Sequence, residues 1–426
     1  MTRASLRLLL TRLRPDASGS PPMNAVARLT YQFDRLRSMP FGVLDTAAST
    51  FLLLVAVQAY QAGAIEKALI AAGGNVGMLT APLVVQTVER MRWPTSRAAA
   101  VIALLGGVAF MAAGIISALS AFVLLSVVAV ACTQAVVPLM TQVYQDNYAP
   151  RERGKYYSRA LVLRVAASSV FAQLAGMFLT NDIQSFRWLL VIYAVAFWVA
   201  AFFFWRIPSR ALALSGSTNP LRAVNYVLKD RVFTWTLGVW MVMGFANLMM
   251  TPMRIEYLAN PIYGLQLDAQ SIALLTSVIP GIARLVMGPV WGLIFDRANF
   301  FVLRMVLNVG FALGIATFFT GNSALGLIAG AAIFGVAASG GDLAWSLWVT
   351  KFAPPARVAD YMSVHTFLTG VRGVVAPIVA YQLLNSLSLG ALSWISAALI
   401  LLATLMLIPE IRHGRVKAPI ANDNNA

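Results

Sequence analysis

Six ionisable side chains interrupt stretches of the sequence that are otherwise apolar. They are Asp45, Arg164, Arg284, Asp342, His365 and Arg372. A charge inside an apolar segment is costly, so each is a functional candidate by default. Arginine offers a planar set of donors that fits carboxylate or phosphate, and histidine titrates near neutral pH. These residue types therefore indicate recognition of an anion and movement of a proton.

The spacing of these residues predicts how deep each one lies in a helix. Arg284 precedes Asp296 by a distance of roughly 18 Å, and Arg372 follows Tyr361 by roughly 17 Å, at about 1.5 Å per helical residue. We expect Arg284 and Arg372 to lie near the membrane midplane and to bind one anionic solute together. Asp342 and His365 lie less deep, and we expect them to carry protons, as Asp45 could.

A structural role is the alternative for the same acids. Asp342 could simply neutralise one arginine, and Asp45 could pair with Arg164. Polar side chains that we expect to line the same cavity are Asn247, Gln58, Gln134 and Trp345. Met249 and Met253 are four residues apart and share a helix face. Their thioethers suit Cu(I), although methionine also fills irregular space in helices.

The composition indicates that membrane helices position these residues. Hydrophobic residues make up 59% of the 426 residues and charged residues only 11%. A membrane span needs about 20 predominantly apolar residues. Twelve such runs are predicted: 41–62, 72–88, 98–119, 121–143, 157–179, 188–205, 232–253, 269–295, 301–320, 323–348, 361–384 and 387–408.

The basic residues predict the orientation of these spans. Of the 32 lysines and arginines, 26 fall in the two termini and in alternate loops, whereas Lys67, Arg187 and Arg254 are assigned to the opposite loops. This bias predicts that both termini are cytoplasmic. We also expect the chain to lie in the inner (plasma) membrane. The net charge of +16 therefore reflects the basic residues of the cytoplasmic loops, and we expect no nucleic-acid partner.

The two halves of the sequence repeat each other. Residues 81–90, "APLVVQTVER", match residues 288–297, "GPVWGLIFDR", and residues 147–158 match residues 351–362. The predicted divisions are a basic segment 1–40, a six-helix bundle 41–206, a linker 207–231, a second bundle 232–409 and a tail 410–426. Parallel repeats of this kind place a transport site at the interface of the halves.

The second copy, with Gly292, Asp296 and Arg297, resembles the signature of the major facilitator superfamily between helices 2 and 3 and between helices 8 and 9. The first copy departs from it, with Val85 in place of the glycine and Glu89 in place of the aspartate. The resemblance covers about residues 41–409 and implies an all-α membrane fold of twelve helices in two bundles. It also implies that helices 3, 6, 9 and 12 are peripheral, and all six buried charges fall on the other helices.

The resemblance further implies a gate, in which each acid faces the start of a helix of the other bundle. A carboxylate is stabilised by the free N–H groups and dipole of a helix N-terminus. We expect Glu89 to lie near Arg357 and Asp296 near Arg153. The repeated positions assigned to this gate are Glu89, Arg90, Arg97, Asp296, Arg297, Arg304, Arg153 and Arg357.

The expected function is therefore secondary transport of a small, anionic organic solute by alternating access, with proton coupling as a further expectation. We expect no enzymatic activity, no cofactor and a monomer whose partners are the solute and the lipid bilayer. The alternatives are a Cu(I) or metal-complex importer, a drug exporter and a non-transporting assembly factor. A copper-importing branch of the family uses a methionine pair in helix 7 together with a histidine and a methionine in helix 8. Helix 8 here has Met287 but no histidine.

Overall fold

The computed structural model describes residues 24–212, 229–320, 323–353 and 358–412. Within these ranges the chain forms twelve helical segments that are long and apolar enough to cross a membrane. The linker residues 213–228 and the tail from 413 onward, both named in the predicted divisions, lie outside the described residues. The predicted all-α fold with twelve spans is confirmed.

The N-terminal bundle contains the first six spans. Its elements are α2 (Ala25–Thr46), η1 (Ala47–Phe51), α3 (Leu52–Gln58), α4 (Ala64–Met91), α5 (Thr95–Ile115), α6 (Leu119–Ala135), α7 (Val137–Asn147), α8 (Pro150–Asn181), η2 (Ile183–Ser185) and α9 (Phe186–Arg206). The first span is continuous from α2 to α3, with the π-helical turn η1 between them. Its helix begins at Ala25, well before the predicted start at Phe41, because Asn24 caps α2 through a bond from the Val26 N–H.

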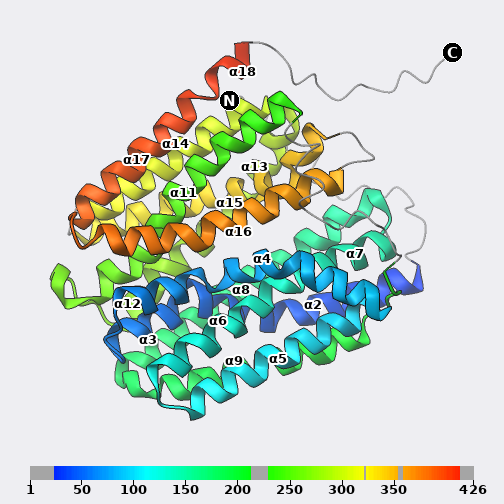
Figure 1. Cartoon of the computed structure of the whole chain (residues 1–426), viewed down its shortest axis with the longest axis horizontal. Helices are drawn as coiled ribbons and strands as arrows, with labels where there is room; N and C mark the ends of the chain where they lie inside the picture. Colours follow the sequence, from blue (N-terminus) through cyan, green and yellow to red (C-terminus); the bar gives the residue numbers. More distant parts are fainter. Residues whose placement is uncertain (1–23, 213–228, 321–322, 354–357, 413–426) are drawn as a thin grey trace, which may run out of the picture.

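The C-terminal bundle repeats this pattern. Its elements are α11 (Arg231–Ala259), η3 (Pro261–Tyr263), α12 (Ala269–Ala273), η4 (Leu274–Val278), α13 (Ile279–Arg297), α14 (Phe300–Phe319), α15 (Ala324–Leu347), η5 (Trp348–Lys351), α16 (Val358–Leu383), α17 (Leu389–Leu405) and α18 (Ile408–Arg412). Span eight also contains a π-helical turn, η4, between α12 and α13. Figure 1 shows the two halves as separate bundles, one blue to green and the other green to red.

We call the end at which α9 ends and α11 begins the linker end, and the opposite end the distal end. The bundles contact each other through α3 and α11, α4 and α16, and α8 with α12, η4 and α13. In Figure 1, α12 of the second bundle lies beside the first bundle. Glycine makes one of these contacts possible, because a Cβ on Gly373 of α16 would overlap the side chain of Asn75 of α4.

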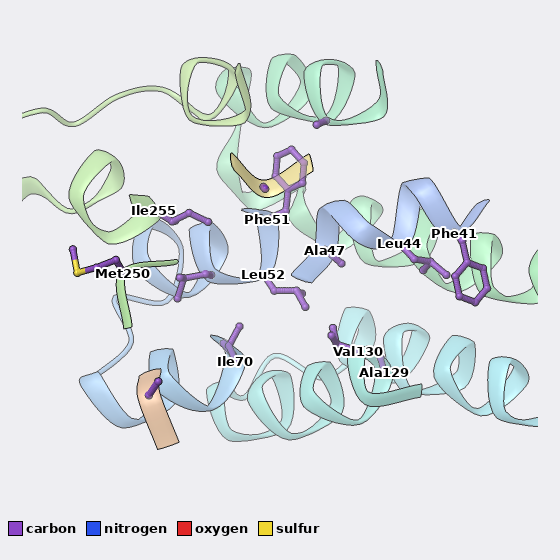
Figure 2. Packing of buried hydrophobic residues seen from close by; sticks show 14 of the residues in the cluster. Phe41, Leu44, Ala47, Phe51, Leu52, Ile70, Ala129, Val130, Met250 and Ile255 are labelled. Atoms are coloured by element: carbon purple, nitrogen blue, oxygen red, sulfur yellow. The ribbon is translucent and has the colours of Figure 1, made fainter. Parts of the chain in front are cut away.

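The apolar core follows the first span and continues into both bundles. Phe41, Leu44, Ala47, Phe51 and Leu52 are almost fully buried. Figure 2 shows them running past Ile70, Ala129 and Val130 on one side and toward Met250 and Ile255 of α11. This packing fixes the position of the first span between the helices that carry the candidate residues.

Several basic residues, Arg97 and Arg187 among them, lie in helices and not in the loops to which the charge pattern assigned them, and three of them are also buried. Lys67 lies in α4, Arg254 in α11 and Arg304 in α14, and all three are buried. The assignment failed because α4 and α11 extend beyond their predicted apolar runs to include Lys67 and Arg254, and because Arg304 lies within the ninth predicted run. Each of the three cations packs against another helix. The expectation that no peripheral helix carries a buried charge is also wrong, since Arg304 belongs to the ninth span.

Candidate functional site

Asp45 and Arg164 form an ion pair between α2 and α8. The Arg164 Nε donates to Asp45 Oδ2 at 2.6 Å, and Nη2 donates to Oδ1 at 2.5 Å. This two-bond geometry matches the planar guanidinium to the planar carboxylate. Gly42 allows the approach of the helices, because a Cβ there would overlap the Arg164 carbonyl. The expected pairing is confirmed, whereas a proton-carrying role for Asp45 stays a prediction.

Arg284 of α13 lies beside Asp342 of α15, with 3.7 Å between Nε and Oδ2. The two side chains are 38% and 62% exposed, so solvent screens the pair. Gly281, one helical turn earlier, packs against Ser169 of α8. Residues three apart share a helix face, so Arg284 lies on the face of α13 that is turned toward the N-terminal bundle.

Arg372 of α16 has different surroundings from Arg284. It is 9% exposed, and its Nη1 donates to the Trp240 carbonyl of α11 at 2.5 Å. Gly244 makes room for the guanidinium, because a Cβ there would overlap it. Arg372 contacts α11 and Arg284 lies beside α15, so the two expected anion-binding arginines have different neighbours within the described residues. The Nε of Arg372 has no hydrogen-bond partner among the described residues, so Arg372 retains a donor while it holds the Trp240 carbonyl.

His365 lies two helical turns before Arg372 in α16 and is fully buried. Its ring contacts the rings of Trp240, Trp345 and Trp348, with centroid distances of 5.5, 5.4 and 5.1 Å. Neither ring nitrogen has a hydrogen-bond partner among the described residues. The structure thus places the candidates His365 and Trp345 together, inside the C-terminal bundle.

The remaining polar candidates lie on different helices. Gln58 Nε2 donates to the Leu267 carbonyl at 3.3 Å, across the two bundles. Gln134 of α6 contacts α4 at Gly74. Asn247 Oδ1 is buried and has no partner in the described part of the chain. Met249 and Met253, the alternative copper ligands, are both buried in the apolar core.

The predicted gate lies partly outside the described residues, which exclude Arg357 and the side chain of Asp296. Glu89 is buried at the end of α4. Arg153 Nη2 donates to the Gln145 carbonyl of its own bundle at 3.1 Å. Arg90 and Arg297 lie at the ends of α4 and α13, and Arg97 lies over the Trp205 ring at 5.4 Å. The gate contacts therefore stay a prediction.

A buried ion pair near the distal end was missed by the sequence analysis. Lys67 Nζ of α4 donates to Glu256 Oε1 of α11 at 2.6 Å. Asn260 Nδ2 donates to the same oxygen at 2.6 Å, and the Tyr381 hydroxyl donates to Oε2 at 3.4 Å. The signal was present in the sequence, because Lys67 is one of very few cations on its side and Glu256 is an acid near the end of an apolar run.

Hydroxyl and carboxylate contacts also join the bundles in their distal halves. The Thr50 hydroxyl lies 2.9 Å from that of Thr276 and 2.8 Å from that of Ser277. Thr180 Oγ1 donates to Asp268 Oδ2 at 3.1 Å and accepts from the Gln270 N–H at 3.0 Å. Burial raises the pKa of Asp268, but the hydrogen bonds from Ser271 and Thr180 outweigh burial and lower it.

A cavity of about 590 Å³ lies next to the Lys67 ion pair. Its walls come from the end of the first span, the start of α4 and the segment after α11, with Gln58, Gln61, Asn260 and Gln266 as its amide side chains. The cavity is thus at the distal junction of the bundles, away from the Arg284–Asp342 pair.

The family profile described as Major Facilitator Superfamily matches residues 38–371. The chain belongs to the major facilitator superfamily. It is a multi-pass membrane protein of this transporter family, as the twelve spans and the two bundles also indicate. The subfamily is not assigned.

Solved structures with this fold share little sequence with the chain. The nucleoside transporter NupG matches with a TM-score of 0.71 and 14% identity, over 90% of this chain and 99% of its own. A D-xylose–proton symporter matches with 0.69 and 14%, over 89% and 97%. The human organic anion transporter MFSD10 (TETRAN) matches with 0.63 and 15%, over 91% and 100%. At these identities the likeness shows the fold alone. No curated protein matches the sequence of the chain.

Proposed function

We propose that this major facilitator superfamily member is a secondary active transporter of a small, anionic organic solute. The observation that carries the proposal is the position of Arg284. It follows Gly281, which packs against Ser169 of the opposite bundle, by one helical turn, and its Nε has no hydrogen-bond partner among the described residues. A guanidinium that is always charged and retains a free donor is suited to a carboxylate or phosphate group.

Asp342 supplies a reason for coupling to protons. Its carboxylate is 3.7 Å from Arg284 Nε and is largely exposed. An arriving anionic solute competes with this carboxylate for Arg284, and protonation of Asp342 removes the competitor. We therefore propose that one proton enters with the solute through Asp342. Arg372 has a structural role in this proposal, because its hydrogen bond to the Trp240 carbonyl holds α16 against α11.

Alternating access requires that the bundles separate first at one end and then at the other. The inter-bundle hydrogen bonds of Lys67, Thr50 and Thr180 lie in the distal halves of the spans and hold that end closed. We propose that the linker end is cytoplasmic, as the arginine and lysine distribution predicts. Glu89 and Asp296 then act at the linker end, where the resemblance places a gate.

Transport in proteoliposomes tests the proposal and forms our first prediction. The purified protein is screened for counterflow of radiolabelled carboxylates and organic phosphates, and then Arg284→Lys is compared with wild type. Lysine keeps the charge but loses the paired donors, so we expect uptake to fall by about tenfold or more, which corresponds to about 1.4 kcal/mol. Arg187→Lys, an exposed arginine bonded to Ser117 in the N-terminal bundle, is the matched control.

The Asp342→Asn variant tests the proton step separately and is our second prediction. We expect it to lose uptake driven by a pH gradient and to keep solute-for-solute exchange, because the solute site remains but the proton carrier is gone. Near-normal uptake by Arg284→Lys would contradict the anion site. Equal loss of gradient-driven uptake and exchange in Asp342→Asn would contradict the proton role.

A further inference from the structure

A second group of cationic side chains gathers around Trp240, inside the C-terminal bundle. The Arg304 guanidinium of α14 lies over the Trp240 ring, with 3.9 Å between Cζ and the ring centroid. Arg372 of α16 donates to the carbonyl of the same tryptophan. Trp240 is thus the common neighbour of two buried positive charges that come from different helices.

No carboxylate neutralises either arginine within the described residues. The ion pairs found there belong to Arg37, Lys67, Arg164 and Arg284. The Trp240 ring and the Met243 thioether, which accepts from Arg304 Nη2 at 2.8 Å, offset only part of the cost of burying Arg304, because neither carries a negative charge. An unpaired charge buried in a membrane protein costs several kcal/mol. Arg304 and Arg372 are two such charges around one tryptophan. We therefore expect a negative charge that the protein itself does not supply to lie beside them.

Buried polar atoms without partners in the described part of the chain surround the same place. They include Nε of Arg372, both ring nitrogens of His365, Nε1 of Trp348 and the hydroxyl of Thr369. His365, Thr369 and Arg372 are spaced at four and three residues, so they share one face of α16. That face packs on α11, because His365 contacts the Trp240 ring and Arg372 the Trp240 carbonyl. Buried donors normally find partners, and an anion would accept from several of these at once.

The packing limits the size of such an anion. The Trp240 and Trp348 rings are stacked 4.9 Å apart, and the His365 ring lies 5.1 Å from Trp348. Gly244 supplies space only for the guanidinium of Arg372. These packed rings leave no room for a solute of many atoms unless they separate, so the inferred occupant must be an ion of atomic size.

We propose that the C-terminal bundle holds a small monovalent inorganic anion such as chloride beside Trp240, bound by Arg304 and Arg372. This site is separate from the proposed transport site, because Arg284 lies on the face of α13 turned toward the other bundle. The bound anion neutralises one of the two buried charges and fixes α14 and α16 against α11. It serves as a structural ion of the bundle.

Chloride-dependent stability of the purified protein in detergent tests this proposal. The melting temperature is measured while chloride replaces gluconate at constant ionic strength, and we expect a saturable increase, because a ligand that binds only the folded state stabilises it. Arg304→Gln and Arg372→Gln should each abolish the chloride dependence. Gly244→Ala keeps both charges but displaces the Arg372 guanidinium, and it should weaken the apparent chloride affinity by about tenfold or more, or about 1.4 kcal/mol.

Two controls separate this site from other effects. Arg97→Gln removes an arginine that also lies over a tryptophan, Trp205, and should keep the full chloride response. Arg284→Gln should keep it too, so that failure of the transport proposal leaves this test unaffected. A wild-type melting temperature that is independent of chloride overturns the proposal, as does a response that survives in both Arg304→Gln and Arg372→Gln. Should those variants fail to fold, an anomalous bromide peak beside Trp240 in wild-type crystals supports the proposal and its absence overturns it.

Discussion

Individual buried charges in this protein act through their partners on other helices. The side chains of Lys67 and Glu256 are 11% and 3% exposed, so solvent screens their attraction little. Glu256 also accepts from Asn260. A buried pair adds little net stability over an apolar pair, but removal of one partner alone typically costs about 3–5 kcal/mol. The Lys67–Glu256 pair therefore makes closure of the distal end dependent on both charges.

Our third prediction follows from this asymmetry. Glu256→Gln leaves Lys67 buried and unpaired, so we expect a lower melting temperature and a distal end that opens more often. The double variant Lys67→Met with Glu256→Gln removes both charges and should recover much of the lost stability. A double-mutant cycle on melting temperatures measures the coupling, and additive effects of the two single changes would contradict it.

At the scale of elements, the junction between α8 and α12 depends on a titrating group. Asp268 precedes α12 and accepts from Thr180 of α8 at 3.1 Å. The pKa of Asp268 is lowered in the folded protein, because its hydrogen bonds favour the ionised form more than burial disfavours it. A carboxyl of this kind stabilises the folded state above its unfolded-state pKa of about 3.9. That contribution is lost as the pH falls through the lower folded-state pKa.

The fourth prediction is that Asp268→Asn removes this part of the acid sensitivity. Above about pH 5 the variant should melt at a lower temperature than wild type, because the charged acceptor is gone. Toward about pH 3 the difference should shrink, because wild type loses the same contribution. Melting curves across this range measure it, with Asp182→Asn, an acid that caps η2 within one bundle, as the control. A difference that stays constant over this range would contradict the prediction.

The elements themselves could be predicted because length and hydropathy define a membrane span. The repeat of "APLVVQTVER" and "GPVWGLIFDR" indicated the two bundles. The sequence did not reveal that Arg304 lies over Trp240, because burial of an arginine one turn inside α14 depends on a ring contributed by α11. The Asp45–Arg164 pair could be predicted from the sequence, because each residue is isolated in an apolar run. The Arg372–Trp240 contact could not be predicted from the sequence, because its acceptor is a backbone carbonyl, which every residue has.

At the scale of the whole molecule, the two bundles are joined in their distal halves. The proposed alternating-access cycle requires contacts at the linker end to break and re-form. The predicted linker-end contacts are between carboxylates and helix starts, and each contributes about 0.3–1 kcal/mol. A change from about 1:99 to 99:1 between two states requires about 5.5 kcal/mol. Loss of the acids at Glu89 and Asp296 should therefore change the populations of the states without converting one fully into the other.

The fifth prediction is that Glu89→Gln with Asp296→Asn increases the population that is open at the linker end. Spin labels at Ser158 and Lys229 report the linker end, and labels at Gln184 and Ile262 report the distal end, in a Cys132→Ser background that removes the single cysteine. The distance between the two spin labels, measured by double electron–electron resonance, should lengthen for the pair at the linker end. It should stay unchanged for the pair at the distal end, because the Lys67–Glu256 bond still closes that end. Asp146→Asn removes an acid that accepts from Gln142 of its own helix, so it should change neither distance. Unchanged distances at both ends in the double variant would show that these acids do not hold the linker end closed, and the repeated acids would then report loop topology alone.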